Sequence, residues 1–268
     1  TLSRNVAVEY GLFVLLLVPL THAGGDVQVD ESRTRILIQT EPVEVQLAVT
    51  NSTGKSLTAI VQLELLDPHD RAAAKTSSTQ PIAPGSQTLQ LSIPFSLTKL
   101  TDQERREIIW YRLRYRLSEA STLAEGIVSL SQSPDLFELR LVTSELAREG
   151  SLYHVRVNAS HPITHKPAAN VEVTGDLLLE DDANRSVKLH VTRTTDSSGY
   201  ALLEFRIPPR FPQFPHTTQT SGGEVKLIGR KGVVVAKAES DVVLDQFART
   251  LITPDKPIYQ PGQTMHVR

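Results

Sequence analysis

Residues 43–49 read VEVQLAV, and residues 57–65 read LTAIVQLEL. In the first stretch valine and leucine occupy every second position, and in the second leucine, alanine and valine do so. Side chains of a β-strand point alternately to the two faces of a sheet, so this period indicates strands with one buried and one solvent-facing side. The small and polar residues 51–55 between the two stretches predict a hairpin turn.

The same alternation continues through the first half of the chain. It predicts strands at residues 89–93, 109–117 and 127–130. In the second of these, Arg112, Arg114 and Arg116 share one face and the apolar residues share the other. Ser133 and Pro134 follow the last strand, and we place a domain boundary there.

Two local signals refine this first unit. Thr101 and Glu104 have the spacing of a capping box, which predicts a single helical turn. Such a turn is common at one corner of an immunoglobulin-like sandwich, where Tyr111 becomes a candidate for the tyrosine-corner residue.

The second half of the chain repeats the pattern. Strands are predicted at residues 137–141, 153–159, 171–179, 187–193, 201–207, 225–229 and 233–243. Residues 208–223 are rich in proline, threonine and glycine and predict a long surface loop. About seven strands in a unit of this length are typical of a β-sandwich, so the fold class is all-β, with tandem immunoglobulin-like antiparallel β-sandwiches.

Composition excludes several classes of function. The chain has 268 residues, 40% of them hydrophobic and 22% charged, which is enough for two globular cores. Its formal charge of -2 offers no basic field for nucleic acid. With no cysteine it can form no disulfide, thiolate metal site or cysteine nucleophile.

The beginning of the chain is typical of an exported protein. An apolar run from Gly11 to Leu20 is followed by Thr21, His22 and Ala23, whose small residues suit a signal-peptidase site near Ala23. We therefore interpret residues 1–25 as a signal-peptide-like segment. The chain starts with threonine and its one methionine is Met265, which leads us to expect a fragment of a longer protein.

Candidate reactive groups are few. His161 and His165 are the closest histidine pair, but a proline follows His161 in a predicted loop. Glu180 to Asp182 form an acidic cluster without the ligand spacing of a calcium loop, so a hairpin tip is the favoured interpretation. No serine has a nucleophile-elbow context. We therefore predict no enzyme activity, no catalytic residue, no cofactor and no metal site.

Two surface features remain open. The three arginines of residues 109–117 could bind a ligand, although a solvated outer face is the favoured interpretation. Asn51, Asn158 and Asn184 each begin an Asn-x-Ser/Thr sequon. Since extracellular modules without cysteine favour a bacterial source, we expect these sequons to be unused.

The most specific stretch lies at the end of the chain. Residues 253–268 read TPDKPIYQPGQTMHVR. Pro257 stiffens the entry, Tyr259 can fill a core position, and Pro261 with Gly262 makes a tight turn before a strand. This segment resembles the opening of a macroglobulin domain of the MG2 type in bacterial α2-macroglobulin-family proteins. The motif residues that carry the resemblance are Asp255, Lys256, Pro257, Tyr259, Pro261 and Gly262, and their expected role is structural.

The resemblance implies a domain layout and a function. The layout is a signal-peptide-like segment (1–25), a first β-sandwich (26–133), a second, macroglobulin-like β-sandwich (134–248) and the start of a truncated macroglobulin domain (249–268). The implied function is that of an N-terminal scaffold in a secreted endopeptidase inhibitor that traps proteases, with proteases and neighbouring macroglobulin domains as partners. The implied location is extracellular, periplasmic or at the cell surface. The alternative is an adhesin-like sandwich array that binds a glycan or a protein.

Overall fold

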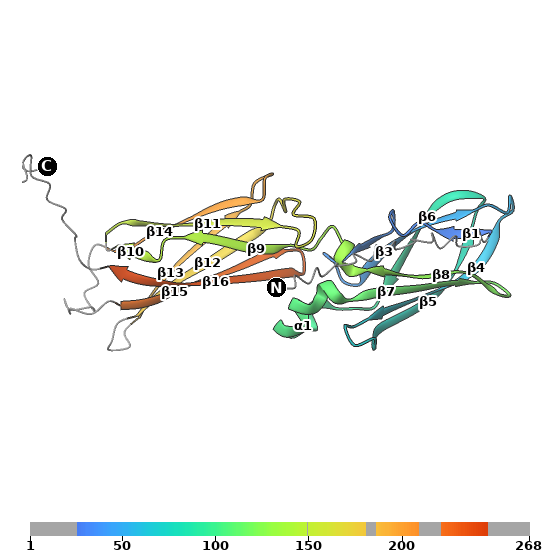
Figure 1. The fold of residues 1–268 in the computed structure, drawn as a ribbon, viewed down its shortest axis with the longest axis horizontal. Helices are drawn as coiled ribbons and strands as arrows, with labels where there is room; N and C mark the ends of the chain where they lie inside the picture. Colours follow the sequence, from blue (N-terminus) through green and yellow to red (C-terminus); the bar gives the residue numbers. More distant parts are fainter. Residues whose placement is uncertain (1–25, 149, 181–185, 209–220, 246–268) are drawn as a thin grey trace, which may run out of the picture.

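The computed structural model describes residues 26–148, 150–180, 186–208 and 221–245. These residues form two β-sandwiches that lie end to end along the long axis of the molecule (Figure 1). The fold class predicted from the period-2 pattern is confirmed, because nearly all strand pairs are antiparallel. In the part of the chain that the structure describes, no helix is long and apolar enough to cross a membrane.

The first sandwich consists of two four-stranded sheets. In one, β3 (Val43–Asn51) pairs with β6 (Gly85–Ile93) on one side and with β1 (Val27–Val29) and β2 (Arg35–Leu37) on the other. The other has the order β5 (Ala72–Ile82), β4 (Leu57–Leu66), β7 (Arg112–Ser118), β8 (Thr122–Ser129). The alternating valines and leucines of β3 and β4 face each other between the sheets and are almost completely buried.

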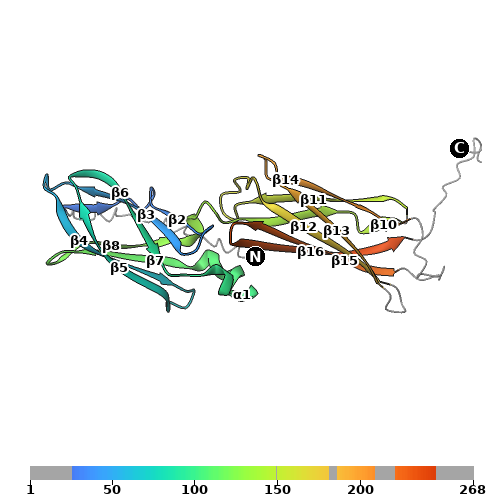
Figure 2. The ribbon, with the colours of Figure 1, turned by 180° about the vertical axis from the view of Figure 1, so that it is seen from behind.

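The second sandwich pairs a five-stranded sheet with a three-stranded sheet, as both views of the molecule show (Figures 1 and 2). The larger sheet has the order β10 (Leu146–Arg148), β16 (Val234–Asp245), β15 (Ser221–Lys231), β12 (Glu172–Glu180), β13 (Ser186–Thr194). The smaller has the order β14 (Tyr200–Arg206), β11 (Leu152–Ser160), β9 (Glu138–Thr143). Strand β10 pairs with β16 in parallel. Residues 221–223, predicted to be loop, belong to β15, while residues 209–220 lie outside the described residues.

The prediction of a hairpin turn at residues 51–55 is wrong. Strands β3 and β4 belong to opposite sheets, so the turn crosses the edge of the sandwich instead of joining two paired strands. The side chain of Asn51, which is 2% exposed, organises this crossing. Its amide nitrogen donates to the carbonyls of Lys55 (2.7 Å) and Ile82 (3.0 Å), and its oxygen accepts from the Thr53 backbone. Period-2 alternation is the same on both sides of a hairpin and of a crossover, so the pattern alone could not separate them.

The predicted helical turn is confirmed as α1 (Asp102–Glu107), with the capping box between Thr101 and Glu104. It lies among the short 3₁₀ turns Leu97–Lys99 and Ile108–Trp110, and a third 3₁₀ turn, Leu130–Gln132, follows β8. Tyr111 is buried with its ring against Phe95, at 5.8 Å between centroids. Among the described residues nothing hydrogen-bonds the Tyr111 hydroxyl, so the predicted tyrosine corner is not seen there.

The hydroxyl of Tyr115 connects two parts of the first sandwich that are far apart in the sequence. It is 4% exposed in β7, and its hydroxyl donates to Glu31 Oε1 at 2.8 Å, in the turn between β1 and β2. Burial and this hydrogen bond raise the pKa of Tyr115 far above its usual value, so the hydroxyl remains a donor. Gly126 pairs with Tyr115 across β7 and β8, and a Cβ at Gly126 would overlap the Tyr115 hydroxyl and the Glu31 carboxylate.

We therefore expect Gly126→Ala to destabilise the first sandwich by about 1–3 kcal/mol, the usual cost of inserting a methyl group into a filled space. Gly222→Ala is the matched control, because a Cβ there meets nothing within 4 Å. Urea unfolding of both variants measures the difference. Equal stabilities for the two would show that the space beside Tyr115 is not needed.

Candidate functional site

The junction between the sandwiches is built around the carboxylate of Asp135. After the 3₁₀ turn Leu130–Gln132 the chain passes through Ser133, which is fully buried, and Asp135, which is 8% exposed. Asp135 Oδ2 accepts the backbone N–H groups of Ile38 (2.8 Å) and Gln39 (3.3 Å), and Oδ1 accepts the Gln39 side-chain amide at 2.7 Å. A residue at the entry of the second sandwich thus satisfies donors at the end of β2 in the first.

His161 holds the same linker from the second sandwich. Its ring is 6% exposed, and Nδ1 accepts the backbone N–H groups of Ile163 and Thr164, both at 3.1 Å. Because Nδ1 is an acceptor, the neutral ring carries its proton on Nε2, which lies 3.1 Å from the carbonyl oxygen of Ser133 and donates to it. The histidine therefore links the loop after β11 to the linker.

The tip of the β15–β16 hairpin supplies a third contact. The Val233 N–H donates to the Gln39 carbonyl at 3.0 Å. Gly232 forms the turn with φ of 58°, and a Cβ there would overlap that carbonyl. Only glycine combines this left-handed conformation with such a close approach. Gln39 is consequently held by groups from the linker and from the hairpin.

Charge and apolar packing complete the junction. Lys237 of β16 reaches Asp102 of α1 with 2.7 Å between Nζ and Oδ2, and this hydrogen bond lowers the pKa of Asp102. Both side chains are more than half exposed, so the pair adds little stability. The buried linker residues Leu130, Leu136 and Phe137 belong to one hydrophobic cluster that includes core residues of both sandwiches.

These contacts give the junction a structural role, because they connect the two sandwiches. Linked domains move relative to each other unless their interface is extensive and well packed. Here hydrogen bonds from two segments, the linker and the β15–β16 hairpin, meet at residues 38–39, and one hydrophobic cluster includes core residues of both sandwiches. The junction can therefore hold two sandwiches at a fixed angle.

We expect Asp135→Ala to cost about 2–3 kcal/mol, because it leaves the Ile38 and Gln39 N–H groups buried without an acceptor. Lys237→Ala is the control and should change stability by less than about 0.5 kcal/mol. Urea unfolding measures the stability, and small-angle scattering or residual dipolar couplings measure the angle between the sandwiches. A rigid pair of sandwiches in the Asp135→Ala variant would contradict the role given to this carboxylate.

The histidine pair weighed as a metal site does not have that role. Both ring nitrogens of His161 are hydrogen-bonded to the backbone, which leaves no free lone pair for a metal. His165 is exposed in the same loop, with φ of 54°. Among residues 26–148, 150–180, 186–208 and 221–245, no three histidine, aspartate or glutamate side chains come together as a metal site would require. Asp181 and Asp182 of the acidic cluster lie outside the described residues.

Arg112, Arg114 and Arg116 of β7 lie on a solvated face and are paired with acidic or polar side chains, which agrees with the interpretation favoured from the sequence. The Arg112 guanidinium lies 2.6 Å from the Asp70 carboxylate, and Arg114 donates a hydrogen bond to Glu64. Arg116 donates a hydrogen bond to the Thr122 hydroxyl and lies 3.8 Å from the Glu125 carboxylate. Lys75 also reaches Glu64, at 2.7 Å. The acidic partners leave little positive charge for a ligand.

Hydrogen bonds from Lys75 and Arg114 hold the pKa of Glu64 below its usual value. The stability that this group adds is present above its unfolded pKa of about 4.3 and is lost as the pH falls through the lower folded pKa. Glu64→Gln should therefore destabilise the protein by up to about 1 kcal/mol at neutral pH and match the parent in acid. Glu125→Gln, at a longer and more exposed pair, is the control. Urea midpoints across pH measure the effect, and a pH-independent difference would contradict it.

One polar row on the second sandwich was not expected from the sequence. On the outer face of the larger sheet of the second sandwich, His190 Nδ1 lies 2.8 Å from Asp176, and its Nε2 lies 3.5 Å from Thr192 Oγ1. The acid-histidine-hydroxyl order is that of a catalytic triad. However, the His190 side chain is 60% exposed on a solvated face, where Lys188 also contacts Asp176 at 3.0 Å. The hydrogen bonds from His190 and Lys188 outweigh burial and lower the pKa of Asp176. These contacts make the row a cross-strand ion-pair network.

Some of the remaining residues that the sequence analysis named lie outside the described residues, and others lie within them. The motif residues Asp255, Lys256, Pro257, Tyr259, Pro261 and Gly262, the signal-peptide-like segment and Asn184 all lie outside the described residues. Asn51 has its amide buried in the crossover described above. Asn158 lies half-buried on β11.

Comparisons with known proteins found no matching family model and no matching curated protein. Among solved structures, the native α2-macroglobulin of Escherichia coli matches 84% of this chain and 15% of its own, at 14% identity and a TM-score of 0.33. A mutant Salmonella α2-macroglobulin matches 90% of this chain and 16% of its own, at 15% identity and a TM-score of 0.35. A superoxide reductase of Ignicoccus hospitalis matches 40% of this chain and 80% of its own, at 10% identity and a TM-score of 0.28.

This is a structural resemblance only. The chain spans 15 to 16% of the length of these two α2-macroglobulins.

Proposed function

We propose that this chain is a scaffold section of a longer, exported α2-macroglobulin-like endopeptidase inhibitor, in which it holds neighbouring domains at a fixed angle and forms part of the wall around a trapped protease. The observation that carries the proposal is the Asp135 junction. A wall that encloses another protein must keep its shape under thermal motion, and a chain of freely hinged sandwiches would not.

The assignment to an α2-macroglobulin-like inhibitor rests on the sequence of residues 253–268. Their sequence, TPDKPIYQPGQTMHVR, resembles the opening segment of a macroglobulin domain. The chain has no cysteine, so it cannot itself supply the thioester with which members of this family tether a protease. Its contribution to trapping is therefore architectural, and proteases are partners of the longer protein.

The test uses the full-length natural protein. It is incubated with a broad-specificity endopeptidase, and activity is then measured on a large protein substrate and on a small chromogenic peptide. A protease enclosed in a cage retains activity on the peptide and loses it on the protein substrate, because only the peptide can enter. We expect this split, and we expect the isolated 268-residue chain to produce none.

The Asp135→Ala variant of the full-length protein links the assay to the junction. It should protect the large substrate less well, while Lys237→Ala should behave like the parent. Loss of both activities would indicate active-site inhibition and contradict trapping. No effect on any protease, together with binding of the full-length protein to immobilised glycans, would favour the adhesin interpretation.

A further inference from the structure

The two outer faces of the second sandwich differ in character. On the five-stranded sheet, Asp176, Lys226 and Glu239 form one cross-strand row of alternating charge, and His190 extends the row through its hydrogen bond to Asp176. On and beside the three-stranded sheet, large apolar side chains are exposed instead. They are Val142 (68% exposed), Tyr200 (57%), Leu146 (51%), Leu152 (45%) and Leu202 (43%). Such clustering on one face is typical of an interaction surface.

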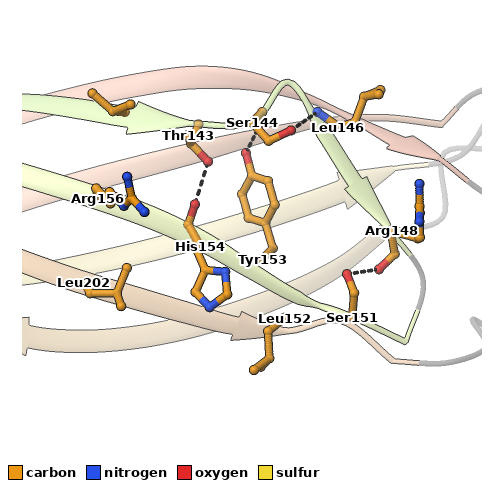
Figure 3. A pocket seen from close by; sticks show the side chains of 11 residues that line it. Thr143, Ser144, Leu146, Arg148, Ser151, Leu152, Tyr153, His154, Arg156 and Leu202 are labelled. Carbon is orange, nitrogen blue, oxygen red and sulfur yellow. Dashed lines mark hydrogen bonds between the residues drawn. The ribbon is translucent and has the colours of Figure 1, made fainter.

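We call this outer face of β9, β11 and β14, with the adjoining β10, the β11 face. It holds an open groove of about 710 Å³ lined by residues of these four strands (Figure 3). Arg156 lies in the centre of β11, opposite Val142 on β9 and Leu202 on β14. Leu152 lies further along β11, opposite Arg206. Apolar and cationic side chains therefore lie side by side on the β11 face, with Arg156 lining the groove and Arg206 beside it.

The wall of the groove is held by hydrogen bonds. Tyr153 donates from its hydroxyl to the Ser144 carbonyl at 2.6 Å, and Thr143 donates to the His154 carbonyl at 2.9 Å (Figure 3). These bonds fix the turn between β9 and β10 against β11. Leu146, which follows that turn, is thus exposed at a set position and not on a free loop. A preformed surface loses little conformational entropy when a partner binds.

The charges of the β11 face are not balanced. Arg140 is paired with Glu138 at 2.6 Å, and Glu204 lies 3.2 Å from His154. Arg156 and Arg206 are both exposed and have no hydrogen bond or ion pair with any residue that the structure describes. Arginine beside aromatic and aliphatic side chains is the composition of protein interfaces. The guanidinium groups of Arg156 and Arg206 can each form charge-assisted hydrogen bonds with a carboxylate of a partner.

We propose that the β11 face binds an extended protein segment that carries both apolar and acidic side chains. Apolar residues of the segment pack on Val142, Leu152 and Leu202, and its carboxylates pair with Arg156 and Arg206. The open groove suits an extended chain, because alternate residues of such a chain point to the same side. This inference is independent of protease trapping.

The probe is a fluorescein-labelled peptide of nine residues, Leu-Ser-Glu-Ser-Leu-Ser-Glu-Ser-Leu, as long as β11 itself (Leu152–Ser160). Its leucines and glutamates share one face when it is extended. Two control peptides replace glutamate with lysine, or leucine with serine. Fluorescence anisotropy with the 268-residue chain should show salt-sensitive binding of the first peptide and at least tenfold weaker binding of both controls.

Variants locate the site. Arg156→Ala should weaken binding about tenfold, in line with the loss of a hydrogen bond to a charged group. Arg230→Ala, which removes an exposed arginine from β15 on the other sheet, should leave binding unchanged. The double change Val142→Ser with Leu202→Ser should also weaken binding, and Ile163→Ser, at an exposed loop residue, is its control. Unchanged urea midpoints verify that the variants are folded.

Three results would overturn the proposal. The first is no binding of the acidic peptide up to millimolar concentration. The second is equal binding of the lysine peptide or of the serine peptide, since either removes one half of the recognition. The third is self-association of the chain in sedimentation that Val142→Ser with Leu202→Ser abolishes, because the face would then be occupied by a second copy.

Discussion

The buried carboxylate of Asp135 depends on donors that the other sandwich provides. Burying an ionised group is costly unless hydrogen bonds replace its hydration, and all three of its donors come from residues 38–39. If the sandwiches separated, Asp135 could regain water, but the contacts of Gln39 with the β15–β16 hairpin and the apolar packing around Phe137 would be lost as well. The orientation of the second sandwich relative to the first is thus linked to the satisfaction of a few buried polar groups.

His161 makes that link specific. A hydrophobic contact tolerates sliding, because apolar packing has no strong directional preference. The imidazole does not, since its two nitrogens must meet two N–H groups on one side and the Ser133 carbonyl on the other. The apolar cluster therefore joins the two sandwiches without a directional preference, and the buried hydrogen bonds select one angle. A scaffold that must keep a fixed shape needs both.

Sequence alone was sufficient for the fold class and for many strands, because burial on one face imposes a period of two that Val43 to Val49 display without interruption. It was also sufficient for the capping box at Thr101, a purely local motif. It failed where distant residues meet. The crossover at Asn51 has the same alternation as a hairpin, and nothing near Asp135 in the sequence indicates that its donors lie about a hundred residues earlier. The polar row at His190 was missed for the same reason.

The unequal faces of the second sandwich are not explained by folding. An exposed side chain such as that of Val142 contributes little to the hydrophobic core. Charged residues in cross-strand ion pairs, like those on the five-stranded sheet, would keep the same strand soluble. Retaining apolar side chains around an unpaired arginine exposes the protein to unwanted association. That cost is offset if a partner covers the face. Because the contacts of Asp135 link the second sandwich to the first, a partner bound to the β11 face would also be held at a set orientation to the first sandwich.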